Sequence, residues 1–169
     1  SGKSTLVDIV MGLLEPQNGN ILIDQKPLDY KNKKKWQSMI SHVPQIIYLT
    51  DSTILQNIAF GVEHTKIDLE KVYSCLKIVN LYNFIKSIPN GIDSIIGENG
   101  VKLSGGQRQR VGIARALYFD REILVMDEAT NALDIKNEKE ILKRIFEYKK
   151  RTVIIISHRK ETLENCDKF

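Results

Sequence analysis

The sequence predicts an α/β domain whose core is a parallel sheet. Two apolar runs, EILVMDE at 122–128 and TVIIISH at 152–158, show no alternation of polar and apolar residues. Such runs, bounded by polar residues, are typical of strands buried on both faces. The segment Asp134–Lys150 between them carries apolar residues at helical spacing, so the order strand, helix, strand predicts parallel pairing. The apolar residues that we expect to face inward from this helix are Ile141, Leu142, Ile145 and Phe146.

The first 60 residues add elements to this unit. A helix over about residues 4–14 is predicted by its apolar spacing and ends before Pro16 and Gly19. NILID at 20–24 predicts a short strand, and SHVPQ at 41–45 predicts a strand end that runs into a loop.

The middle of the chain is predicted to be helical. Helices are expected at Leu69–Asn80 and Leu81–Ser87, and a third begins at Ser104. We therefore expect one domain in which a helical subdomain is inserted into an α/β core. The expected division is a core of 1–60 and 118–169 and a helical subdomain of 61–117.

The composition is that of a globular domain, with 169 residues, of which 42% are apolar and 27% charged. No signal peptide and no apolar run of about 18 residues is visible. Cys75 and Cys166 lack metal-ligand spacing, which favours a reduced, cytosolic setting. The lysine-rich run at 31–35 is expected to be the solvated face of a helix, the alternative being a nucleic-acid or lipid-headgroup patch. Because the net charge of +4 is mild, we expect no nucleic-acid partner.

The opening residues SGKST match the end of a phosphate-binding loop of the form G-x-x-x-x-G-K-[ST]. Ser1, Gly2, Lys3 and Ser4 fill its last positions, so we expect the first half of the loop to lie before Ser1. Gly2 would let the backbone approach a phosphate, and the helix behind it would offer unpaired N–H groups. Lys3 would hold the terminal phosphates, and the Ser4 hydroxyl would ligate Mg²⁺.

Two acids, Asp127 and Glu128, end the apolar run at 122–128. Ligands of open α/β sheets bind at the carboxyl ends of the strands. Asp127 is therefore placed to hold Mg²⁺, and Glu128 to orient or deprotonate an attacking water. The alternative is a pair of ordinary loop acids, one of which caps the next helix.

The stretch LSGGQ at 103–107 predicts a helix start with an unusual composition. Ser104 and Gln107 have the spacing of a capping box, which by itself explains the helix start. The two glycines, Gly105 and Gly106, are unfavourable in a helix by up to about 1 kcal/mol each. Bare backbone at a helix N-terminus suits close approach to an anion.

The motifs SGKST, LSGGQRQR, ILVMDEAT, NALD and ISH occur in an order that resembles the ATP-binding cassette (ABC) ATPases, over nearly the whole chain. The resemblance implies a P-loop NTPase with a RecA-like parallel sheet and a helical ABC subdomain. It also implies hydrolysis of ATP with Mg²⁺ as cofactor. Two cassettes would associate head to tail, with ATP held between the phosphate loop of one and the LSGGQ signature of the other.

The resemblance assigns roles on the phosphate side of the site. Residues 1–5, including Thr5, resemble the phosphate loop and would bind ATP. Gln45 resembles the Q-loop glutamine, which contacts the nucleotide site and Mg²⁺; the alternative is an ordinary loop residue. Asp127 resembles the Walker B aspartate, a metal ligand with Ser4 and Gln45. Glu128 resembles the catalytic glutamate.

Further roles follow for the C-terminal motifs and the signature. Ser104, Gly105, Gly106 and Gln107 would bind the ATP of the partner cassette. Asp134 resembles the D-loop aspartate of the nucleotide site, although it equally fits as a helix N-cap. His158 resembles the catalytic switch histidine; the alternative is a structural histidine. The residues that differ from the commonest ones of the family are Gly112 and Asn131, and we give them no role.

Two stretches resemble exporter-type cassettes, GENG at 97–100 and STILQNIAFG at 52–61. The exporter resemblance implies a transmembrane domain, expected to be fused upstream, and a location at the cytoplasmic face of the cell membrane, the inner membrane in a bacterium. The cargo would be a lipid-linked saccharide, a lipid or a peptide.

The alternative to an exporter is an ABC ATPase without a membrane domain that acts on the ribosome or nucleic acid, and a third possibility is an inactive regulatory cassette. The N-terminal strands of the fold are expected to lie before Ser1, so we expect the chain by itself to bind ATP weakly and to be inactive.

Overall fold

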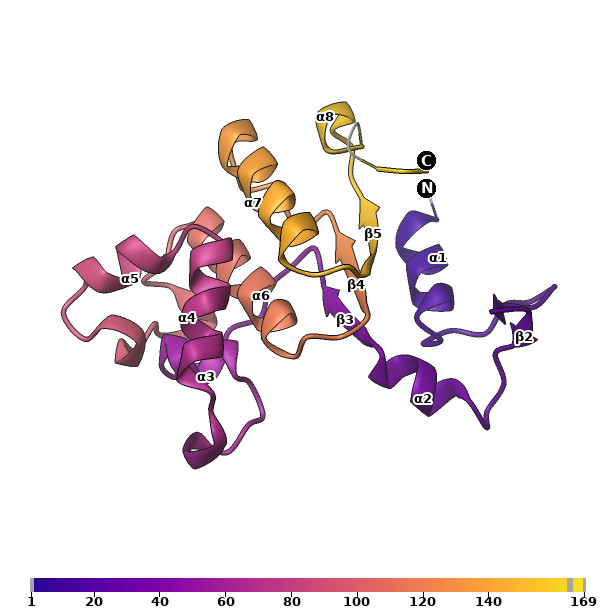
Figure 1. The fold of residues 1–169 in the computed structure, drawn as a ribbon, viewed down its shortest axis with the longest axis horizontal. Helices are drawn as coiled ribbons and strands as arrows, with labels where there is room; N and C mark the ends of the chain where they lie inside the picture. The colour runs from indigo at the N-terminus through magenta and orange to yellow at the C-terminus, as the bar shows by residue number, and fades with distance from the viewer. Residues whose placement is uncertain (1, 164–165, 169) are drawn as a thin grey trace.

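Figure 1 shows the computed structural model of the chain, which describes residues 2–163 and 166–168. The α-helices are α1 (Lys3–Val10), α2 (Lys33–Ser38), α3 (Ile54–Ile58), α4 (Leu69–Ile78), α5 (Tyr82–Ser87), α6 (Gly105–Tyr118), α7 (Ile135–Tyr148) and α8 (Lys160–Leu163). The strands are β1 (Leu22–Ile23), β2 (Lys26–Pro27), β3 (Ile40–Val43), β4 (Ile123–Asp127) and β5 (Thr152–Ile156). Short 3₁₀ turns lie at His64–Lys66, Gly91–Asp93 and Glu98–Gly100.

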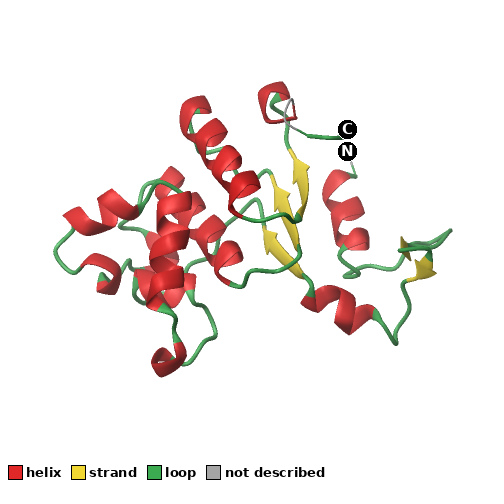
Figure 2. Ribbon diagram, in the orientation of Figure 1, coloured by secondary structure: helices red, strands yellow, loops and turns green. Residues whose placement is uncertain are grey.

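The predicted α/β class with a parallel sheet is confirmed. Strands β3, β4 and β5 form one parallel sheet with β4 in the centre. Val43 pairs with Met126, and Asp127 pairs with Ile156, so the three strands end at the same edge. This edge collects the loops that follow each strand (Figure 2).

The central strand β4 is buried on both faces, as its continuous apolar run predicts. Ile123 and Val125 belong to a cluster with Val7 of α1 and with Met11, which directly follows this helix. Helix α1 therefore covers one face of the sheet. The alternate residues of β4 belong to the larger core cluster, which includes residues of α6 and α7. Figure 1 shows α1 on one side of the sheet and these two helices on the other.

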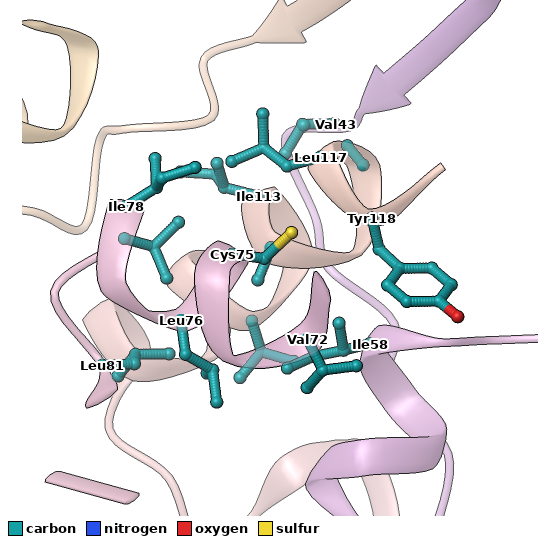
Figure 3. Packing of buried hydrophobic residues seen from close by; sticks show 14 of the residues in the cluster. Val43, Ile58, Val72, Cys75, Leu76, Ile78, Leu81, Ile113, Leu117 and Tyr118 are labelled. Carbon is teal, nitrogen blue, oxygen red and sulfur yellow. The ribbon is translucent and has the colours of Figure 1, made fainter. Parts of the chain in front are cut away.

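The helical part of the chain packs around α4 and α6. Figure 3 shows side chains of these two helices turned toward one another, with Cys75 of α4 near Ile113 and Leu117 of α6. Ile58 of α3 and Val43 of β3 belong to the same cluster. The core therefore runs without a break from the sheet into the helical part.

Two predicted elements near the N-terminus are shorter in the structure. The helix expected to reach residue 14 ends at Val10, because Gly12 adopts a left-handed φ of 69° and turns the chain. The strand expected over 20–24 keeps only β1. Asp24 and Gln25 both have positive φ and form a tight turn that pairs β1 with β2.

The later elements agree with the prediction to within about two residues. Helix α4 ends before Asn80, which has a left-handed φ of 55°. Helix α7 begins after Asp134 and buries Ile141, Leu142 and Ile145, while Phe146 is partly buried against the same core. Helix α3 was not predicted, although Thr53 and Gln56 form a capping box at its start.

Candidate functional site

The site lies at the carboxyl edge of the sheet, where loops from all three strands meet. Gln45 follows β3, Glu128 follows β4 and His158 follows β5. The side-chain amide of Gln45 donates to Oε2 of Glu128 at 3.0 Å, and Nε2 of His158 lies 3.0 Å from Oε1 of the same carboxylate. Two residues that are far apart in sequence, Gln45 and His158, thus contact the carboxylate of Glu128.

Glu128 is held in an unusual backbone conformation. Its φ is 49°, in the left-handed region that a residue with a side chain adopts at a cost of about 1 kcal/mol. Its backbone N–H donates to the carbonyl of Ile156 at 3.0 Å, which ties the end of β4 to β5. Backbone strain of this kind is concentrated at functional sites, and here it aims the carboxylate at the loops after β3 and β5.

Lys3 extends this cluster from the start of α1. Its ammonium lies 3.0 Å from Nε2 of His158, the same nitrogen that faces Glu128. A neutral Nε2 can accept a hydrogen bond from Lys3, whereas a protonated Nε2 can donate to Glu128. Nε2 of His158 therefore lies between the Lys3 ammonium and the Glu128 carboxylate. The tautomer of the ring decides which of the two groups it bonds.

The N-terminus of α1 is built to receive an anion. Gly2, with a φ of 79°, is the N-cap and makes no side-chain cap, and the first turn carries no acidic residue. Ser4 and Thr5 are exposed in this turn. The unpaired N–H groups, the helix dipole and the Lys3 ammonium all favour negative charge here. Ser1, assigned to the same loop, lies outside the described residues.

A magnesium ion would find oxygen ligands at this edge. The hydroxyl of Ser4, the carboxylate of Asp127 at the end of β4 and the amide oxygen of Gln45 are all of the hard type that Mg²⁺ prefers. Within residues 2–163 and 166–168, no group of three or more His, Cys, Asp or Glu could hold a metal without other ligands. A few side-chain oxygens with phosphate and water suit Mg²⁺, which rarely uses an all-protein cage.

The signature residues form a closed cap at the start of α6. Gln107 N–H donates to the Ser104 hydroxyl at 3.2 Å, and Ser104 N–H donates to the Gln107 side chain at 2.8 Å. A Cβ at Gly106 would lie 3.1 Å from the carbonyl oxygen of Ala132, so this glycine lets α6 approach the loop after β4. Gly105 has more room, because its Cβ would meet only ordinary contacts.

Asp134 is the N-cap of α7, the structural role that the sequence predicts beside a role in the nucleotide site. Its carboxylate accepts from the backbone N–H of Asn137 at 3.0 Å and from the Asn137 side chain at 2.6 Å. These two bonds hold the pKa of the exposed Asp134 carboxyl below its usual value.

Two residues with no expected role contact Glu128 or its loop. Asn131 donates its side-chain amide to Oε2 of Glu128 at 2.8 Å. Gln109, buried in α6, accepts from Ala132 N–H at 2.8 Å and donates to the Glu128 carbonyl at 3.4 Å. The sequence signal for Asn131 is its place three residues after Glu128, within reach of a turn; Gln109 carries no such signal.

Within the described part of the chain, no helix is long and apolar enough to cross a membrane.

Comparisons with known proteins agree with this geometry. The family model described as ABC transporter matches residues 1–131. An ATP-dependent lipid A-core flippase of Cupriavidus metallidurans is 41% identical over the full chain, and one of Saccharophagus degradans is 44% identical over 99% of it. The chain spans 29% and 28% of these two relatives.

A solved structure of a bacterial Atm1-family ABC exporter with ATP bound resembles the fold closely. It superposes with a TM-score of 0.90 and 37% sequence identity over 98% of this chain, which covers 29% of that protein. Family membership implies binding of ATP. The chain belongs to the ABC transporter family, as a nucleotide-binding domain of the exporter type.

Proposed function

We propose that this chain binds and hydrolyses ATP to drive export of a lipid across a membrane, as part of a protein that includes a transmembrane domain. The observation that carries the proposal is the linked set Lys3, His158, Glu128 and Gln45 at one edge of the sheet. It combines a phosphate-binding cation, a carboxylate base and two polar groups that orient the base, which is what phosphoryl transfer to water needs.

The residues divide the work of binding and reaction. The backbone of Gly2 to Thr5 and the Lys3 ammonium bind the phosphates, and Ser4, Asp127 and Gln45 hold Mg²⁺, which would neutralise charge on the phosphate oxygens. Glu128 accepts a proton from water as the water oxygen bonds to the γ-phosphorus and the bond to ADP breaks. His158 steadies the transferred group. Most of the rate gain is positioning and electrostatics.

The LSGGQ signature of this chain would contact the ATP that is bound to a second cassette. Ser104, Gly105, Gly106 and Gln107 lie at the N-terminus of α6, whose dipole favours an anion, and would meet the ATP of a head-to-tail partner. Asp134 would line the same interface. We also propose that a core of 1–60 and 118–169 carries the phosphate loop and that a helical subdomain of 61–117 carries the signature, as such a dimer requires.

The cargo proposal rests on the relatives. The two relatives described above, which match over the whole chain or nearly so, are named lipid A-core flippases, so we propose a lipid or lipid-linked saccharide as cargo rather than a peptide. The protein would act at the cytoplasmic face of the membrane, the inner membrane in a bacterium. Gln45 and residues 97–100 would transmit closure of the cassettes to a transmembrane domain encoded upstream.

The test is ATP hydrolysis by the purified full-length protein in proteoliposomes. We expect Mg²⁺-dependent turnover that rises when lipid A-core is added and does not rise with peptide. Glu128→Gln is expected to keep ATP binding and to lose at least about 100-fold in kcat. The control is Glu140→Gln in α7, a half-buried residue whose carboxylate contacts Asn80 and Arg144, which should turn over normally. A wild-type protein without ATPase activity, or an active Glu128→Gln variant, would contradict the proposal.

A further inference from the structure

We propose that Asn131 is a positioning residue for Glu128, and that its side-chain amide fixes which carboxylate oxygen is free to take a proton. This inference rests on the proposed function, in which Glu128 is the base. Asn131 Nδ2 lies 2.8 Å from Oε2 of Glu128, the shortest of the contacts given above for this carboxylate. A hydrogen bond to an ionised group is about twice as strong as one between neutral groups.

The chemistry fixes the orientation of the Asn131 amide. An ionised carboxylate only accepts hydrogen bonds, so the NH₂ end of the amide must face Glu128. Gln45 Nε2 donates to the same oxygen at 3.0 Å. With two amides on Oε2, Oε1 is the oxygen that faces Nε2 of His158 and, beyond it, the Lys3 ammonium. That is the side on which the phosphates are expected.

The backbone of Asn131 is held at both of its polar groups. Its N–H donates to the Glu128 carbonyl at 3.2 Å, which closes a turn over residues 128–131. Its carbonyl accepts from the guanidinium of Arg159 at 3.0 Å. Because Arg159 directly follows His158, this bond connects Asn131 to the loop that carries His158. These two hydrogen bonds fix the backbone from which the exposed Asn131 side chain extends.

Asn131 and Gln45 differ in what else they must do. Gln45 comes from the loop after β3, 83 residues away, and is also proposed to hold Mg²⁺. Asn131 belongs to the same turn as Glu128 and has no other proposed task. Its contact with Glu128 therefore does not depend on the loop after β3 or on Mg²⁺, which makes it a specific aid to the base rather than to nucleotide binding.

The experiment measures steady-state ATP hydrolysis by the full-length exporter with Asn131→Ala and the near-isosteric Asn131→Asp. We expect kcat to fall about tenfold in the alanine variant, with KM for ATP within about twofold of wild type, because the lost bond is to the base. The aspartate should lower kcat further, about 100-fold, because it places a second carboxylate beside Glu128.

The control is Glu140→Ala, which removes an amide–carboxylate bond of the same length, from Asn80 Nδ2 to Glu140 Oε2 at 2.8 Å, together with the ion pair to Arg144, away from the site. Its kcat and KM should match wild type. A purely structural role for Asn131 would instead lower the melting temperature and leave the kcat of the folded protein unchanged.

The outcomes separate this inference from the proposed function. If the wild-type exporter hydrolyses ATP and Glu128→Gln does not, the proposed function stands. Should both Asn131 variants then turn over within about twofold of wild type, or should KM rise in proportion to the loss of kcat, Asn131 is not a positioning residue for the base. If Asn131→Ala fails to fold, the aspartate variant decides in the same way, since it preserves shape.

Discussion

Glu138 accepts a hydrogen bond from the guanidinium of Arg159 at 2.5 Å, and this ion pair joins helix α7 to the loop after β5. The other carboxylate oxygen accepts hydroxyl bonds from Thr130 and Thr162, each at 2.6 Å. Arg159 also donates to the carbonyl of Leu133 at 3.0 Å. One buried carboxylate thus connects the segments that follow β4 and β5, and both segments carry proposed catalytic residues.

We expect Glu138→Ala to destabilise the chain strongly. Removing one partner of a buried pair costs about 3–5 kcal/mol, because the other charge loses its compensation. Arg159 is 29% exposed, so the loss should lie near the lower end, about 3 kcal/mol. Urea unfolding followed by circular dichroism measures it. Glu140→Ala, which breaks the exposed pair with Arg144, should lose no more than about 1 kcal/mol; equal losses would contradict the prediction.

The same carboxylate makes stability depend on pH. Burial would raise the pKa of Glu138, but hydrogen bonds from Thr130, Thr162 and Arg159 outweigh it and hold the pKa below the ordinary value of 4.5. A carboxyl whose pKa is lower in the folded state contributes stability above its unfolded pKa and loses it as pH falls. Between about pH 5.5 and 3.5, wild type should therefore lose more free energy of unfolding than Glu138→Gln. Parallel curves for the two proteins would show that Glu138 does not carry the effect.

Much of the site could be predicted because it follows the ends of buried strands. The runs before Glu128 and His158 are apolar without alternation, which fixes two parallel strands and therefore one shared edge. The only sequence signal for the contact between Asn131 and Glu128 is their spacing, and the turn that closes it includes the left-handed backbone of Glu128, which no local signal predicts for glutamate. The contacts of Arg159 could not be predicted, because its partners Asn131, Leu133 and Glu138 lie more than 20 residues away in the sequence.

The elements that differed from prediction depend on turns and on distant partners. The sequence predicts Gly12 inside a helix, since one glycine in an apolar pattern is tolerated, yet the positive φ of Gly12 ends α1. Helix α3 is five residues long, too short for a periodic pattern to show. It is held by Arg115 of α6, whose guanidinium donates to the Asn57 carbonyl at 2.7 Å, a contact between residues 58 apart.

The two cysteines should differ in reactivity. Burial raises the pKa of the Cys75 thiol to about 11, so the thiolate that reacts with alkylating agents is almost absent at pH 8. Cys166 is only partly buried. We expect iodoacetamide to label one thiol, Cys166, in the native chain and both in urea, as counted by mass spectrometry. The variant Cys166→Ser should then remain unlabelled until it unfolds, and rapid native labelling of it would contradict the buried placement of Cys75.

The substitution Gly112→Ala should change the free energy of unfolding in opposite directions with and without the Ile47 side chain, because Ile47 fills the space beside Gly112. A Cβ at Gly112 would lie 2.6 Å from Cδ1 of Ile47 and 2.9 Å from its two Cγ atoms. Alanine is favoured over glycine in a helix by about 1 kcal/mol, but overpacking typically costs 1–3 kcal/mol. We expect Gly112→Ala to lower the free energy of unfolding by about 1 kcal/mol when Ile47 is present.

Replacing Ile47 by alanine first removes the atoms that clash. In that background Gly112→Ala should raise the free energy of unfolding by about 1 kcal/mol, since only the helix propensity remains. A double-mutant cycle by urea unfolding measures the difference, and its coupling energy of about 2 kcal/mol would reflect direct contact. The same sign in both backgrounds would mean that the loop moves aside freely. Because Ile47 lies two residues after Gln45, a strong coupling also means that the signature helix α6 fixes the loop through which Gln45 reaches Glu128.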